Sequence, residues 1–128
     1  MENILADTTV LIDHLRGVEQ AKTFLKQNTP HISHVIVAEL IEGTKNKNHL
    51  RQVNQAVSDL SHIPISESIS SKAISLMEKY FLSHKLELPD ALIAATAMVE
   101  NLTLVTGNIK HFSFIKNLKL LAWNQAQQ

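Results

Sequence analysis

Short apolar stretches alternate with longer amphipathic ones along the whole chain. The short stretches are typical of buried strands and cover residues 3–6, 31–33, 63–65, 102–106 and 118–122. Between them, apolar residues recur at the spacing of three and four that places them on one face of a helix. This periodicity predicts helices over residues 8–16, 18–27, 35–45, 50–60, 67–84 and 90–101. Alternation of this kind predicts a parallel sheet covered by helices.

The pattern also predicts which helix faces are buried. The clearest helical pattern lies in residues 67–84, whose expected core positions are Ile69, Ala73, Leu76, Met77, Tyr80 and Phe81. In residues 35–45 the expected inward positions are Val35, Ala38, Leu40 and Ile41. Both sets follow from helical spacing alone.

Glycine and proline indicate where several elements end. Gly17 is a suitable C-terminal cap for the first helix, and Pro30 closes the second. Pro64 lies within the third predicted strand, and a proline cannot donate a ladder hydrogen bond. That strand is therefore expected at an edge of the sheet.

Composition indicates one globular domain over residues 1–128. The chain is long enough to bury its own core, and 45% of its residues are hydrophobic. Its formal net charge is zero, so overall charge does not point to nucleic acid, and it has no cysteine. The longest apolar run, residues 91–95, is too short to span a membrane, and the N-terminus resembles no secretory signal. We expect a soluble, cytoplasmic protein without a membrane partner.

Three acidic residues have informative positions. Asp7 directly follows the first predicted strand, Asp90 opens a predicted helix, and Glu39 lies within the apolar segment VIVAELI. Functional groups of open parallel sheets gather beyond the carboxyl ends of the strands. Each acid also has a structural interpretation, since Asp7 and Asp90 are good N-caps and Glu39 could be an exposed helix residue. Together, such carboxylates could hold one or two Mg²⁺ ions.

Four motifs resemble those of the PIN-domain family, and especially its VapC-type toxins. They are ADTTVLIDHL at residues 6–15, ISHVIVAELIEG at 32–43, LPDALIAATA at 88–97 and LVTGNIKHF at 104–112. The motifs stand in family order and nearly at family spacing, and they cover almost the whole chain.

The resemblance implies a three-layer α/β/α domain around a central parallel sheet of about four to five strands. It further implies a homodimeric endoribonuclease that uses Mg²⁺ or Mn²⁺, with RNA as substrate and a cognate antitoxin protein as partner. Carried over by position, Asp7, Glu39 and Asp90 are the catalytic, metal-binding acids. Hydrolysis of the RNA phosphodiester would use a metal-activated water, with Glu39 as a ligand or proton acceptor.

One position departs from the family pattern. A fourth acid is usual near the end of the last motif, where this chain has His111, while Thr106 and Asn108 match the family's polar positions. An imidazole can bind Mn²⁺ or Zn²⁺, whereas Mg²⁺ prefers oxygen, so weakened or altered metal binding is expected. The alternative is a surface histidine. Asp13 and Glu42 are secondary site candidates.

Rival functions differ in how well the sequence supports them. With Gly17, Gly43 and Gly107 as its only glycines, the chain contains neither a dinucleotide-binding nor a P-loop motif. A catalytically weakened PIN-fold protein-binding module remains open, and His111 favours it. A metal-dependent phosphatase or DNA nuclease on the same scaffold is the third alternative.

Overall fold

The computed structural model describes residues 3–124 and contains a five-stranded sheet whose neighbouring strands are all parallel. In chain order the strands are β1 (Ile4–Ala6), β2 (His31–Ser33), β3 (Ser61–Ile63), β4 (Thr103–Thr106) and β5 (Leu120–Ala122). The helices are α1 (Thr8–Leu15), α2 (Glu19–Asn28), α3 (His34–Glu42), α4 (Lys47–Ser58), α5 (Glu67–His84) and α6 (Leu88–Val99), with a short 3₁₀ helix η1 (Ile109–His111).

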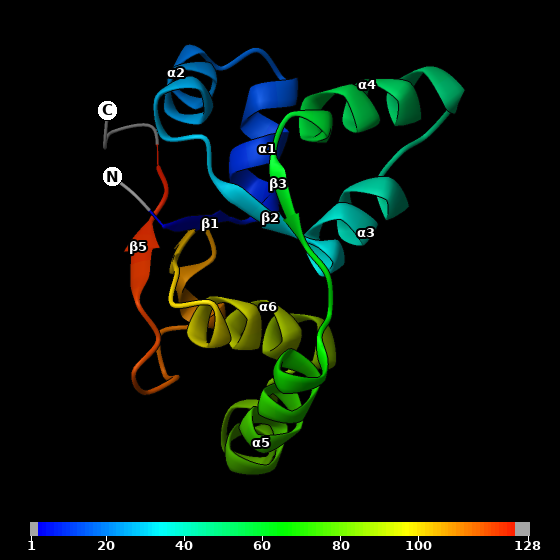
Figure 1. Cartoon of the computed structure of the whole chain (residues 1–128). Helices are drawn as coiled ribbons and strands as arrows, with labels where there is room; N and C mark the ends of the chain where they lie inside the picture. Colours follow the sequence, from blue (N-terminus) through cyan, green and yellow to red (C-terminus); the bar gives the residue numbers. More distant parts are fainter. Residues whose placement is uncertain (1–2, 125–128) are drawn as a thin grey trace.

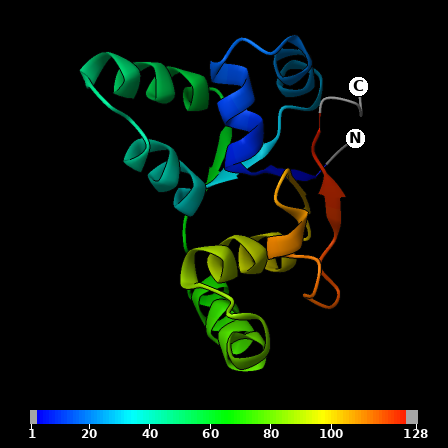
Figure 2. The ribbon, with the colours of Figure 1, turned by 180° about the vertical axis from the view of Figure 1, so that it is seen from behind.

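The helices form two layers around the sheet. Helices α1, α2 and α4 lie on one side and α5 and α6 on the other, while α3 lies at the side of the sheet between the two groups (Figure 1). The view from behind shows the same arrangement (Figure 2). The three-layer α/β/α fold with a central parallel sheet of about four to five strands is therefore confirmed.

The strand order β3-β2-β1-β4-β5 produces a switch point in the middle of the sheet. From β1 the chain builds outward through β2 to β3, and it then returns to the other side of β1 to form β4 and β5. The loops that follow β1 and β4 therefore lead away in opposite directions, which leaves a crevice beyond the carboxyl ends of these strands. Asp7 follows β1 at this point, and Thr106 ends β4.

The core lies around these two central strands. Residues of β1 are at most 1% exposed, and Leu104 and Val105 of β4 are equally buried. A strand that is buried on both faces has apolar side chains at nearly every position, and this pattern made both segments identifiable from the sequence. Within residues 3–124, the structure has no helix with the length and apolar character that a membrane crossing requires.

Two predicted helix faces are partly wrong. In α3, Ala38 and Ile41 are exposed, and Ile36 is buried in their place. In α5, Phe81 is 44% exposed, although Ile69, Ala73, Leu76 and Tyr80 are buried as predicted. Apolar residues surround much of α3, so its periodicity could not select the side that faces the core.

Several boundaries also differ from the prediction. Strand β3 ends before Pro64, at the predicted edge of the sheet. Helix α6 begins at Leu88 with Pro89 in its first turn, so Asp90 lies inside the helix and is not its N-cap. Proline at the start of a helix is favourable because its missing N–H would have no helical partner there. The helix η1, which positions His111, was not predicted.

Candidate active site

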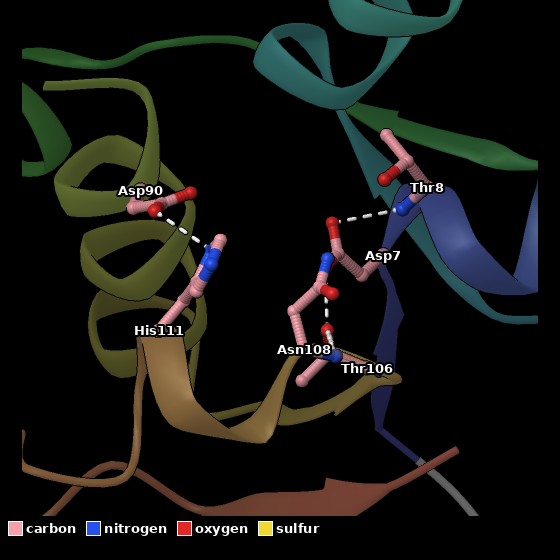
Figure 3. Close-up of polar contacts among 6 residues, drawn as sticks. All are labelled: Asp7, Thr8, Asp90, Thr106, Asn108 and His111. Carbon is pink, nitrogen blue, oxygen red and sulfur yellow. Dashed lines mark hydrogen bonds and ion pairs between the residues drawn. The ribbon is translucent and has the colours of Figure 1, made fainter. Parts of the chain in front are cut away.

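Asp7 lies at the switch point of the sheet with both carboxylate oxygens engaged. The side chain is 3% exposed and caps α1, where its Oδ1 accepts a hydrogen bond from the Thr8 backbone N–H at 2.8 Å. Its Oδ2 accepts a second bond from the Thr106 hydroxyl at 2.6 Å, across to the neighbouring strand (Figure 3). Asp7 is thus a helix cap, as one interpretation of the sequence proposed, and the same contacts hold its carboxylate in one orientation.

The loop after β4 is anchored to the start of α1 by a second set of contacts. The Thr106 hydroxyl accepts a hydrogen bond from the Asn108 N–H at 3.0 Å, and the Thr9 hydroxyl accepts one from the Gly107 N–H at 2.8 Å. A Cβ at Gly107 would lie 3.3 Å from atoms of the Thr9 side chain, so glycine permits this close approach. Sequence reasoning missed Thr9, because only the fold brings it to Gly107.

A cleft of about 230 Å³ collects the three predicted acids. Its lining consists of Asp7, Thr8, Glu39, Glu87, Pro89, Asp90, Asn108 and His111. These residues come from four separate stretches of the chain, at the starts of α1 and α6, the middle of α3 and η1. Asp90 and His111 face Asp7 and Asn108 in Figure 3. Glu87 is an acid that sequence reasoning did not select, since no motif position marked it.

The crowding of carboxylates alters their protonation. Partial burial, together with the negative charges of Asp7 and Asp90, raises the pKa of Glu39 from 4.5 to about 7. Burial also raises the pKa of Asp90, and the nearby His111 partly offsets that rise. The negative charges of the cleft therefore disfavour ionisation of Glu39, and a bound cation would relieve this repulsion.

His111 is paired with Asp90. Its Nδ1 lies 3.4 Å from the Asp90 Oδ2, and the two side chains are 58% and 24% exposed. The imidazole therefore lines the cleft from its outer rim, so it can meet a ligand without the cost of leaving a buried position.

Two secondary candidates lie elsewhere. Asp13 accepts a hydrogen bond at 3.0 Å from the indole N–H of Trp123, and that contact ties α1 to the segment after β5. Glu42 is an exposed residue at the end of α3. Neither lines the cleft. Their selection as site residues is therefore not supported by their positions.

The donors of the cleft suit a divalent metal ion. It offers carboxylate oxygens from Asp7, Glu39, Glu87 and Asp90 and the amide of Asn108, and hard cations prefer such oxygens. Within residues 3–124, no three acidic or imidazole side chains converge closely enough to hold an ion as they stand. Because Thr106 holds Asp7 while Asp90 faces His111, assembly of a metal centre requires rotation of some of these side chains.

A second, larger groove of about 520 Å³ adjoins the acidic cleft. It lies between α1, α3 and α4, and it shares Thr8 and Glu39 with the cleft. Its apolar lining comes from Ile12, Leu15, Leu40 and Val53, and Arg16 and Lys45 add positive charge. An extended ligand in the groove would thus reach the acidic residues directly.

Replacing Glu39 with glutamine is expected to raise the unfolding temperature of the metal-free protein at pH 8. The unfolded chain ionises this side chain above its ordinary pKa of 4.5, but the folded protein does so only near 7. Ionisation therefore costs stability that grows between these pH values and persists above them. Removing the charge should gain on the order of 1 kcal/mol after solvent screening, or roughly 4 °C.

Thermal unfolding of Glu39→Gln at pH 8 and pH 4 tests this expectation. The gain should nearly vanish at pH 4, where the carboxyl is mostly protonated in both folded and unfolded chains. Glu78→Gln, at an exposed position of α5, is the matched control and should show no gain. An unfolding temperature of Glu39→Gln at or below that of the unsubstituted protein at pH 8 would contradict the prediction.

Replacing Thr106 with valine is expected to weaken metal binding by about 10- to 100-fold. The substitution removes the donor to Asp7 and the acceptor for the Asn108 N–H, so both residues lose their fixed positions. Titration with Mn²⁺ measures the effect. Thr106→Ser keeps the hydroxyl and should retain most of the affinity, whereas equal affinities of all three proteins would exclude a positioning role.

Known proteins similar to this chain are found both by comparison of sequences and by comparison of structures. The family model of the PIN domain matches residues 4–116. Ribonuclease VapC10 of Mycobacterium tuberculosis is 40% identical over 121 residues, which cover 91% of this chain and 90% of the relative.

Two solved structures extend the comparison. A toxin–antitoxin complex from Klebsiella pneumoniae contains a chain with 33% identity and a TM-score of 0.76, covering 92% of this chain and 95% of that one. VapBC2 from Rickettsia felis, bound to a DNA fragment from its promoter, contains a chain with 27% identity and a TM-score of 0.77, covering 97% and 100%.

Proposed function

This chain belongs to the PIN-domain family, and from that premise we propose that it is a metal-dependent endoribonuclease and the toxin of a toxin–antitoxin pair. The ribonuclease activity is supported by the name of the relative from Mycobacterium tuberculosis. The pairing with an antitoxin is supported by the complexes in which similar chains occur. Neither the choice between Mg²⁺ and Mn²⁺ nor the roles of individual residues follow from these likenesses, and both are part of the proposal.

The gathering of Asp7, Glu39 and Asp90 in one cleft at the switch point carries the proposal. These acids lie up to 83 positions apart in the sequence, yet burial of Glu39 together with the nearby charges of Asp7 and Asp90 raises its pKa to about 7. Such a concentration of charge is costly unless a cation neutralises it. Asp7 and Asp90 are the proposed direct ligands.

The residues of the cleft would divide the chemistry of hydrolysis between them. A Mg²⁺ or Mn²⁺ ion held by Asp7 and Asp90 would supply charge stabilisation at the phosphate oxygens and would lower the pKa of water. The water oxygen forms a bond to phosphorus while the bond to the leaving ribose oxygen breaks. Glu39, which lines the cleft with Asp7 and Asp90, would accept the proton of the attacking water, and solvent would protonate the leaving ribose oxygen. Thr8 and Thr106 hold the Asp7 carboxylate in place, and no protein nucleophile is needed.

Cleavage of a mixed set of structured and single-stranded RNAs tests the proposed function. Purified protein would be compared in Mg²⁺, in Mn²⁺ and with a chelator, and Asp90→Asn would reveal a contaminating nuclease. Metal-dependent cleavage that Asp90→Asn loses supports the proposal. Cleavage retained by the variant, or faster hydrolysis of DNA or a small phosphate ester than of RNA, would contradict it.

A protein-binding module with weakened catalysis is the second candidate function. His111 replaces the acid that the family pattern has at this position, and within residues 3–124 no three ligands converge as they stand. Absence of cleavage in every metal, combined with binding of the cognate antitoxin, would favour this function over the nuclease.

The groove beside the acidic cleft is the proposed site of the antitoxin. Its apolar lining would bind apolar side chains of the partner, and its continuity with the cleft at Glu39 would let the same segment block the acids. Ile12→Glu, at a position that is 36% exposed and lines the groove, should weaken antitoxin binding without loss of cleavage by the free toxin. Unchanged antitoxin affinity would place the partner elsewhere.

We also propose a homodimer, as the family resemblance implies. Exposed apolar residues on α5 support it, since Ile74, Phe81 and Leu82 are 54%, 44% and 84% exposed. Such side chains on a surface helix mark a candidate contact. A single molecular mass equal to one chain across the micromolar range in light scattering would contradict this part of the proposal.

A further inference from the structure

His111 is distinguished from the other residues of the cleft by its donor atom. The other polar side chains in the lining present oxygen or an amide, whereas His111 presents an imidazole nitrogen beside Asp90. In Figure 3 the ring lies on the same side as Asp90 and faces the side occupied by Asp7 and Asn108. A nitrogen donor in this place changes which cations the cleft favours.

The His111 and Asp90 side chains form an ion pair that is longer than a short charge-assisted hydrogen bond. The Nδ1 and Oδ2 atoms are 3.4 Å apart, whereas a charge-assisted hydrogen bond spans about 2.7–2.9 Å. Two neighbouring ligands on one metal lie roughly 3.0–3.4 Å apart when each bond is about 2.0–2.1 Å long. The separation of these two atoms therefore lies within the range of two neighbouring ligands of one ion, and rotation of the side chains would direct both donor atoms toward it.

The backbone around His111 is well anchored. Phe112, the next residue, is 1% exposed, and the His111 N–H donates to the Asn108 carbonyl at 3.0 Å. The adjoining Asn108 N–H is held by Thr106, which also holds Asp7. The same hydrogen-bond chain thus positions the backbone of His111 relative to the first acid, so little backbone ordering is needed when an ion binds.

We infer that His111 is a nitrogen ligand of the metal centre and shifts its preference from Mg²⁺ towards first-row transition ions such as Mn²⁺. The inference rests on the proposed metal-dependent function and specifies its cofactor. Imidazole binds transition ions well, whereas Mg²⁺ prefers oxygen ligands. A histidine at the position where the family pattern has an acid therefore alters the selectivity of the site.

Pulsed electron paramagnetic resonance of Mn²⁺ bound to the full chain tests the ligation directly. Protein labelled with ¹⁵N only in histidine should show nitrogen modulation of the Mn²⁺ signal that differs from that of unlabelled protein. His111→Gln should lose this modulation. His49→Gln is the matched control and should retain it, because His49 lines the neighbouring groove and not the acidic cleft.

Competition between Mn²⁺ and Mg²⁺ tests the selectivity. His111→Asp should raise Mg²⁺ affinity and lower the ratio of Mn²⁺ to Mg²⁺ affinity by about tenfold, since it supplies a carboxylate in place of the imidazole. Calorimetric titration of the unsubstituted and substituted proteins measures both affinities. An unchanged ratio would overturn the inferred selectivity.

The outcomes separate this inference from the proposed function. Tight Mn²⁺ binding that Asp7→Asn abolishes, without histidine modulation, would overturn the role of His111 and leave the metal-dependent nuclease intact. Mn²⁺ binding that is absent from the unsubstituted protein, or equal in Asp7→Asn, would overturn the metal centre and the inference with it.

Discussion

Asp7→Asn is expected to reduce RNA cleavage by at least about 100-fold while the domain remains folded. The substitution removes a negative charge from the cleft but preserves the size of the side chain. Its amide oxygen can still accept the hydrogen bond from the Thr8 N–H and cap α1. The remaining amide group lies beside the Thr106 hydroxyl, which can accept a hydrogen bond in place of donating one. Asp7→Asn therefore removes the negative charge of this side chain while the helix cap that supports the fold remains.

Single-turnover cleavage and circular dichroism of the same preparation measure both parts of this prediction. Asp59→Asn is the matched control, because Asp59 is an exposed residue that follows α4 and lies outside the cleft. It should keep full activity. Full activity in folded Asp7→Asn would remove this cleft as the site of hydrolysis, whereas an unfolded variant would contradict the expected survival of the cap.

Phe112→Ala is expected to reduce the free energy of unfolding by about 3–5 kcal/mol. Phe112 is 1% exposed and is the largest of the fully buried side chains among the described residues. Its removal leaves a cavity under η1 in addition to the lost burial of apolar surface. Because marginally stable domains have about 5–15 kcal/mol in total, the loss represents a large part of their stability.

Denaturation by urea measures this change, with the metal removed so that ligand binding does not add to stability. Phe112→Leu retains most of the side-chain volume and should cost less than about 1.5 kcal/mol. Equal losses for alanine and leucine would show that the aromatic ring does not act by filling space. A loss below about 1 kcal/mol for alanine would contradict the cavity argument.

Local patterns in the sequence determined most of the secondary structure. The predicted strand over residues 31–33 and the predicted helix over 67–84 have the bounds of β2 and α5. Periodicity, glycine and proline act over a few neighbouring residues, so they can be read without the fold. The motif around Asp7 likewise placed this acid at the carboxyl end of a strand, where the structure has it.

Burial was predictable only where one side of an element is clearly apolar. Helix α5 has such a side, and four of its six predicted core residues, Ile69, Ala73, Leu76 and Tyr80, are buried. Helix α3 is apolar around much of its circumference, and there Ile36 is buried while Ile41 is 40% exposed. The side that faces inward depends on how the helix packs at the edge of the sheet, which its own sequence does not specify.

The tertiary structure alone decided how the acids interact. Thr106 reaches Asp7 across 99 positions of sequence, and Thr9 meets Gly107 across 98. Asp90 lies in the first turn of α6 and faces His111, and the pKa of Glu39 rises because the fold partly buries it and places Asp7 and Asp90 near it. The sequence by itself therefore determined the elements and the types of donor, since these follow from local propensity and side-chain chemistry. Distances, burial and charge repulsion arise only when remote segments pack together, so they depend on the fold.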